Sequence, residues 1–268
     1  MQKTVRVLKK ARGAFLTCFI LGLLLVLLAA AYSLYTNATN EEVFKEALLN
    51  ADVGELMEIV LGNAGLPAGL GASLSLGGDQ QQATAELLSK FAKDTIDYLV
   101  DNTQEWKPTI TVMGMEMAIP MSEDFVAHMA TVKGWVEIGT KAFLALLAVA
   151  GVLLLRVFFS SRRGRSGFSG AGYYIGVFLP VALVLGVVGW AYFDFEGFWA
   201  FLHQYFIPDG IFSNGEVIMQ IFTTDMFKSF MLPIVKTFGM LLGGIVLLPV
   251  LVSPLCNLFK GSVKKING

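Results

Sequence analysis

Apolar residues dominate four long runs of the chain, and more polar segments separate them. The runs cover about residues 13–35, 140–160, 171–193 and 232–255. Each has the roughly 20 residues that a helix needs to cross about 30 Å of hydrocarbon. Because a backbone in lipid must satisfy its own hydrogen bonds, we expect every run to be helical. The pattern predicts an all-α integral membrane protein with four transmembrane helices, forming a single membrane domain over residues 1–268.

The larger polar segment contains further periodic patterns. Residues 41–60 and 83–100 repeat apolar positions at helical spacing, and the glycine-rich stretch 62–78 between them is typical of a loop. Residues 109–119 fit either a short strand pair turning near Gly114 or an apolar flap that contacts lipid. We therefore expect a mainly helical cap outside the membrane.

Two more helices are predicted next to the apolar runs. Ser122 is a good N-cap, and the helix that it starts should continue without a break into the second span. After the third span, residues 194–206 form an aromatic helix at the membrane interface, where Trp and Tyr are favoured. Glu137 and Lys141 stand four residues apart, which fits either a structural ion pair or a role in the site.

Composition and charge add a membrane location and an orientation. Charged residues make up 15% of the chain, against roughly 25% in soluble domains. All 21 Asp and Glu residues lie within segments 36–139 and 194–231, whereas the termini and the 161–170 loop contain only basic charges. The positive-inside rule therefore places both termini in the cytoplasm and the two acidic segments outside. We interpret the basic clusters as topology signals and expect no nucleic-acid partner.

The first apolar run is longer than the 7–15 residues usual in a signal peptide, so we expect an uncleaved anchor. Cys18 and Cys256 both fall in apolar runs, where reduced thiols are expected. No zinc-type spacing and no cofactor motif is present.

The candidate chemistry centres on the two histidines of the chain, His128 and His203. His128 lies about 11 residues before the second span and His203 about 11 residues after the third. Because a short loop joins these spans, the equal offsets predict that both imidazoles lie at a similar height on one face of the membrane. Histidine is well suited to moving protons near neutral pH, so one could act as base and the other as acid. Metal binding with Asp209 or Glu216 is a weaker alternative, and we predict no metal.

Two short motifs carry a resemblance to a known family. The sequence HMATVK, residues 128–133, resembles the first histidine motif of the lipoprotein intramolecular transacylases (Lit), with Thr131 where that family tends to have Asp. FLHQYF, followed by PDGIF and VIMQIFTTDMFKSF, resembles the second histidine motif. The plan of four spans with both motifs outside also agrees.

The resemblance implies a function. These enzymes of the bacterial plasma membrane move an acyl chain from the glycerol ester (sn-2) of a diacylglyceryl-cysteine lipoprotein to its N-terminal amine, leaving an N-acyl lyso-form. Catalysis would fall to His128 and His203 on the extracytoplasmic face, without a cofactor. The expected partners are diacylated lipoproteins and membrane lipid, and we expect a monomer. The residues expected to contact substrate are Thr131, Phe198, Phe201, Tyr205 and Phe206.

Two other classes remain open from the sequence. A non-enzymatic accessory protein could bind lipid or lipoproteins through the outer cap, and it would not need the histidines. A transporter is less favoured because the four spans carry few polar groups.

Overall fold

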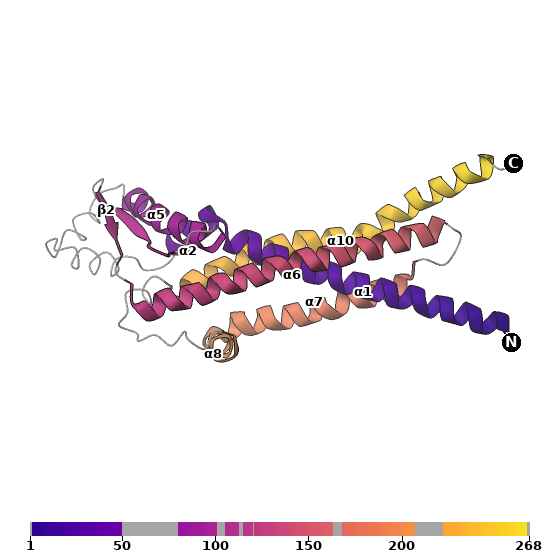
Figure 1. Cartoon of the computed structure of the whole chain (residues 1–268), viewed down its shortest axis with the longest axis horizontal. Helices are drawn as coiled ribbons and strands as arrows, with labels where there is room; N and C mark the ends of the chain where they lie inside the picture. Colours follow the sequence, from indigo (N-terminus) through magenta and orange to yellow (C-terminus); the bar gives the residue numbers. More distant parts are fainter. Residues whose placement is uncertain are drawn as a thin grey trace. The chain divides into compact units, whose positions relative to one another are not determined.

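The computed structural model describes residues 2–49, 80–100, 105–112, 115–119, 121–162, 168–206 and 222–266. In that part of the chain the fold is nearly all helical (Figure 1). Four helices are long and apolar enough to cross a membrane, and each contains one of the predicted runs. They are α1 (Gln2–Ala38), α6 (Glu123–Arg162), α7 (Gly170–Phe193) and α10 (Thr224–Ile266).

The chain divides into two compact units, and it passes from one to the other within these four helices. The first unit comprises Met1–Ser33, Thr140–Gly189 and Lys236–Gly268, and holds most of each apolar run. The second comprises Leu34–Gly139 and Trp190–Val235, and holds both histidines.

In the first unit, α1 is packed tightly against α7. A Cβ added at Gly22 of α1 would lie 2.5 Å from the Tyr173 carbonyl oxygen, and one at Gly176 of α7 would lie 2.1 Å from that of Phe19. No side chain fits at such distances, so the two backbones are in direct contact. Small residues at helix crossings allow this approach in membranes.

A tyrosine of α7 completes the hydrogen bonding of α10. Pro249 has no N–H group, so the carbonyl of Ile245, four residues earlier, has no helical partner. The Tyr173 hydroxyl donates a hydrogen bond to that carbonyl oxygen at 2.7 Å. Tyr173 is itself buried, and the bond therefore satisfies two polar groups inside the first unit.

The second unit contains the predicted outer elements. Helix α2 (Glu41–Leu49) buries Phe44 and Leu48 as expected, while the rest of the predicted 41–60 helix and the 62–78 loop lie outside the described residues. Helix α5 spans Gln80–Val100. Strands β1 (Thr109–Val112) and β2 (Met115–Ala118) pair antiparallel beside α5 (Figure 1). The strand-pair interpretation of 109–119 is thus confirmed, and this hairpin is the exception to an all-helical description of the residues seen.

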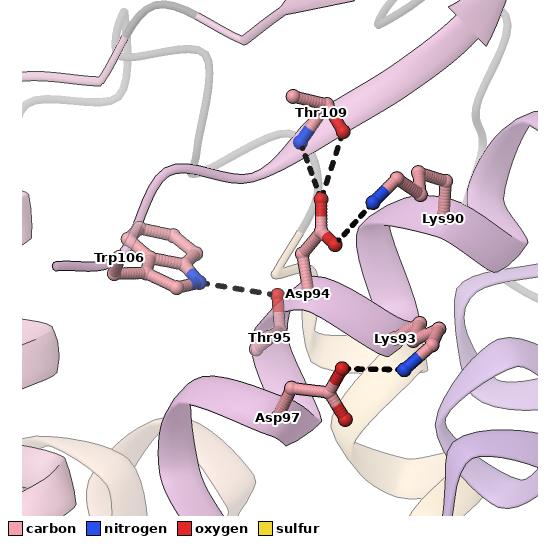
Figure 2. A network of polar contacts seen from close by, with 7 residues as sticks. All are labelled: Lys90, Lys93, Asp94, Thr95, Asp97, Trp106 and Thr109. Carbon is pink, nitrogen blue, oxygen red and sulfur yellow. Dashed lines mark hydrogen bonds and ion pairs between the residues drawn. The ribbon is translucent and has the colours of Figure 1, made fainter. Parts of the chain in front are cut away.

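A partly buried polar network attaches the hairpin to α5 (Figure 2). The carboxylate of Asp94 accepts hydrogen bonds from the Thr109 amide (3.0 Å), the Thr109 hydroxyl (2.8 Å) and the Lys90 ammonium (2.8 Å). Burial alone would raise the pKa of Asp94, but these donors outweigh it and lower the pKa below its usual range. Trp106 Nε1 donates to the hydroxyl of Thr95 at 3.3 Å.

An aromatic core lies under this network. It gathers side chains from α2, from α5 and from the segments adjoining β1 and β2, together with the first turns of α6 and α10 in the same unit. Its largest members are Phe44, Phe91, Tyr98, Trp106, Phe125 and Phe230.

Candidate functional site

His128 is held on the buried side of the first turns of α6. Ser122 caps this helix, since its hydroxyl accepts from the Phe125 amide at 3.2 Å, and Glu123 and Asp124 lie in the first turn as predicted. One turn later His128 is only 8% exposed. The helix continues from there without a break to Arg162, which confirms the predicted continuity.

His203 comes from α8 (Phe195–Tyr205), the aromatic helix predicted after the third span. Asp194 caps it by accepting from the Gly197 amide at 3.0 Å, and Phe206 ends it. His203 is half-buried, and its Nδ1 lies 2.9 Å from the carbonyl oxygen of Trp199, one turn earlier. A carbonyl can only accept, so Nδ1 carries the proton and Nε2 is the basic nitrogen of the neutral ring.

The two imidazoles lie next to each other. Their centroids are 5.8 Å apart and their planes differ by 11°. Two nitrogens up to about 6 Å apart can each reach one atom between them, because a hydrogen bond spans about 3 Å. The predicted proximity of His128 and His203 is therefore confirmed, and the pair can act on a single reacting group.

Each histidine packs against the ring of a neighbouring aromatic residue. The Phe125 ring lies 5.6 Å from His128, and Trp106 lies 5.3 Å from Phe125, which links His128 to the aromatic core of the second unit. The Trp199 ring lies 4.5 Å from His203 and 4.3 Å from Phe227 of α10. Sequence reasoning missed these supporting residues. The i, i+4 spacing of Trp199 and His203 was the one available signal.

The residues predicted to contact substrate lie elsewhere on these helices. Phe198 and Phe201 pack on Trp190, and Phe201 also contacts Tyr205. Helical spacing places Phe198, Phe201 and Tyr205 about 140–160° around α8 from His203. The structure thus does not gather them with the histidines, and Phe201 and Tyr205 are exposed.

The two remaining predicted residues lie near the ends of the site helices. Phe206 is also exposed, and its carbonyl accepts from Trp135 Nε1 at 3.0 Å. Thr131 lies on α6, three residues after His128, and its hydroxyl donates to the Ala127 carbonyl at 3.4 Å.

Lys133, the last residue of the first histidine motif, is held against α5. Its ammonium lies 4.5 Å from the centroid of the Tyr98 ring, within the range of a cation–π contact. Burial raises the pKa of Tyr98, so the phenol stays neutral at physiological pH. Among the described residues, no group of three His, Cys, Asp or Glu side chains is placed to hold a metal ion.

Comparison with known proteins gives the family. The family model described as "Lipoprotein intramolecular transacylase Lit" matches residues 73–227, which is more than half of the chain and includes both histidines. No curated protein and no solved structure matched. With the histidine pair and four candidate membrane spans, the chain belongs to the lipoprotein intramolecular transacylase (Lit) family.

Proposed function

We propose that this protein transfers an acyl chain within one lipoprotein molecule. The substrate is a lipoprotein whose N-terminal cysteine carries a diacylglyceryl thioether and a free α-amine. The chain at the sn-2 ester moves to that amine, leaving an N-acyl lyso-form. The observation that carries the proposal is the His128–His203 pair, with ring centroids 5.8 Å apart, inside the segment that matches the family.

The reaction needs positioning and proton transfer rather than an external energy source. Converting an ester to an amide is downhill, so no ATP is needed. Because nucleophile and electrophile are in one molecule, a site that aligns them provides a large effective molarity. The α-amine must be neutral to attack, yet with a pKa near 8 much of it is protonated at neutral pH. A base close to the amine therefore accelerates the reaction.

The geometry favours His203 as that base. Its Nδ1–H is bonded to the Trp199 carbonyl, which leaves the lone pair of Nε2 to take the proton. The amine nitrogen attacks the ester carbonyl carbon, its proton passes to Nε2, and the carbon–oxygen bond to glycerol breaks. His128 then protonates the departing glyceryl oxygen. Each proton-transfer role is typically worth about 10²–10⁴ in rate.

The acyl chains of the substrate need an apolar surface at the same height as the two histidines. We assign this role to half-buried Phe198 and the exposed rings of Phe201, Tyr205 and Phe206, which would contact acyl chains. Thr131 would contact the substrate head near His128. Charge distribution supports an extracytoplasmic site in a multi-pass bacterial plasma-membrane protein, because the acidic segments hold both histidines.

The test is mass spectrometry of the N-terminal peptide of a reporter lipoprotein, made in a bacterium without N-acylating enzymes. Wild-type protein should yield an N-acyl, lyso-glyceryl peptide of unchanged total mass. His128→Gln and His203→Gln should each abolish it at equal expression. Phe159→Leu, an exposed ring change in the first unit, is the matched control. An unaltered diacyl peptide with well-expressed wild type would contradict the proposal and favour a non-enzymatic lipoprotein-binding protein.

A further inference from the structure

Trp199 contacts His203 in two ways. Its indole centroid lies 4.5 Å from the imidazole centroid, at the short end of the ~4.5–7 Å found for aromatic pairs. Its backbone carbonyl accepts the Nδ1–H of the same ring at 2.9 Å. Side chain and main chain of one residue therefore act together on one imidazole.

The indole is itself held in place. Phe227 of α10 lies 4.3 Å from it, and Phe195, one turn earlier on α8, is stacked on it at 5.6 Å. A ring packed by residues from two helices has little rotational freedom. Trp199 is thus a rigid wall for the imidazole, which a flexible side chain could not provide.

Packing against this indole restricts χ1 and χ2 of His203, the two side-chain torsions that set the position of its imidazole ring. The carbonyl bond requires the ring to keep Nδ1 toward α8, and packing against the indole restricts rotation away from it. When Nδ1 stays bonded, Nε2 faces away from the Trp199 carbonyl and is left to meet a substrate. When Nε2 has taken a second proton, the imidazole is a cation, and an aromatic face within about 6 Å attracts it.

We propose that Trp199 is a positioning residue, which holds His203 in its Nδ1–H form with Nε2 directed at the substrate amine. This inference rests on the proposed function, in which His203 moves a proton. Trp199 does not touch the reacting atoms in this scheme. It acts only through His203.

The first measurement does not need substrate. Because the chain has only two histidines, ¹⁵N-histidine labelling gives two imidazole spectra, and His128→Gln identifies that of His203. Chemical shifts of the ring nitrogens in the neutral form report which nitrogen carries the proton. Wild type and Trp199→Phe should show the Nδ1–H form, whereas Trp199→Leu should show a mixture of both tautomers.

The second measurement is steady-state acyl transfer on a synthetic diacylglyceryl-cysteine peptide. Trp199→Leu should lower kcat about 10- to 100-fold with KM within about threefold, because misplacing a catalytic group by about 1 Å costs up to ~10²-fold. Trp199→Phe keeps a ring and should retain kcat within about threefold. Phe227→Leu removes support behind the indole and should lower kcat less than Trp199→Leu does. It also provides the test if Trp199→Leu fails to fold.

The matched control is Trp190→Leu. This indole packs on Phe198 and Phe201, on another side of α8, and should leave the His203 tautomer unchanged. An active wild type whose folded Trp199→Leu or Phe227→Leu variants keep both tautomer and kcat would overturn the inference alone. A wild type without any transfer would instead overturn the proposed function.

Discussion

Replacing Gly176 by alanine should weaken the contact between α1 and α7. The added Cβ would lie 2.1 Å from the carbonyl oxygen of Phe19, and such contacts essentially never fall below 3.0 Å. The two backbones must therefore move apart by about 0.9 Å. Overpacking of this kind costs about 1–3 kcal/mol, while the better helix propensity of alanine returns about 0.5–1 kcal/mol.

The net loss, about 0–2.5 kcal/mol, should lower the melting temperature in detergent by up to about 10 °C, since each kcal/mol shifts a protein of this size by roughly 2–4 °C. Gly186→Ala on the same helix is the control, because a Cβ there meets nothing within 4 Å. Gly172→Ala should behave like Gly176→Ala, given 2.5 Å to the Phe15 carbonyl oxygen. Equal melting temperatures for Gly176→Ala and Gly186→Ala would refute the reasoning.

Three further predictions concern polar contacts. Asp94→Asn removes the charged acceptor of Thr109 and should destabilise the second unit by about 2 kcal/mol, seen as faster hydrogen exchange of the β1 amides. Because the pKa of Asp94 is lowered on folding, its contribution is complete above an unfolded pKa near 4 and is lost as the pH falls through the folded value, whereas Asp94→Asn should lack this acid dependence. Tyr173→Phe leaves the Ile245 carbonyl without its donor and should cost about 1–3 kcal/mol by thermal unfolding, with the exposed Tyr192→Phe as control. Trp106→Phe removes the hydrogen bond to Thr95 and reduces the packing against Phe125, which contacts His128. The kcat should therefore fall severalfold with KM little changed, and an unchanged kcat would argue against this support.

The histidine pair illustrates how far sequence reasoning reaches. Equal offsets of His128 and His203 from neighbouring spans predicted a similar height on one face, because helix rise is constant and a short loop joins the spans. That the two rings lie side by side depends on how α8 packs beside α6. The structure does not gather Phe198, Phe201 and Tyr205, which were predicted to contact substrate, with the two histidines. The helix 194–206 was correctly placed, yet its composition did not reveal which side carries the histidine support. Aromatic residues occur on several sides of α8. Only the contacts of Trp190 with Phe198 and Phe201, and of Phe227 with Trp199, distinguish one side from the other.

Local patterns thus determined much of this protein by themselves. The apolar runs and the Ser122 cap follow from hydropathy and side-chain hydrogen bonding, which act over a few residues, whereas the pattern of 109–119 fitted either a strand pair or an apolar flap. Tertiary structure alone decided the contact of Gly176 with Phe19, the bond from Tyr173 to the carbonyl freed by Pro249, and the packing of Trp199 between His203 and Phe227. These depend on the register and rotation of one helix against another. Many registers bury similar apolar area, and the choice among them is made by close packing of particular side chains.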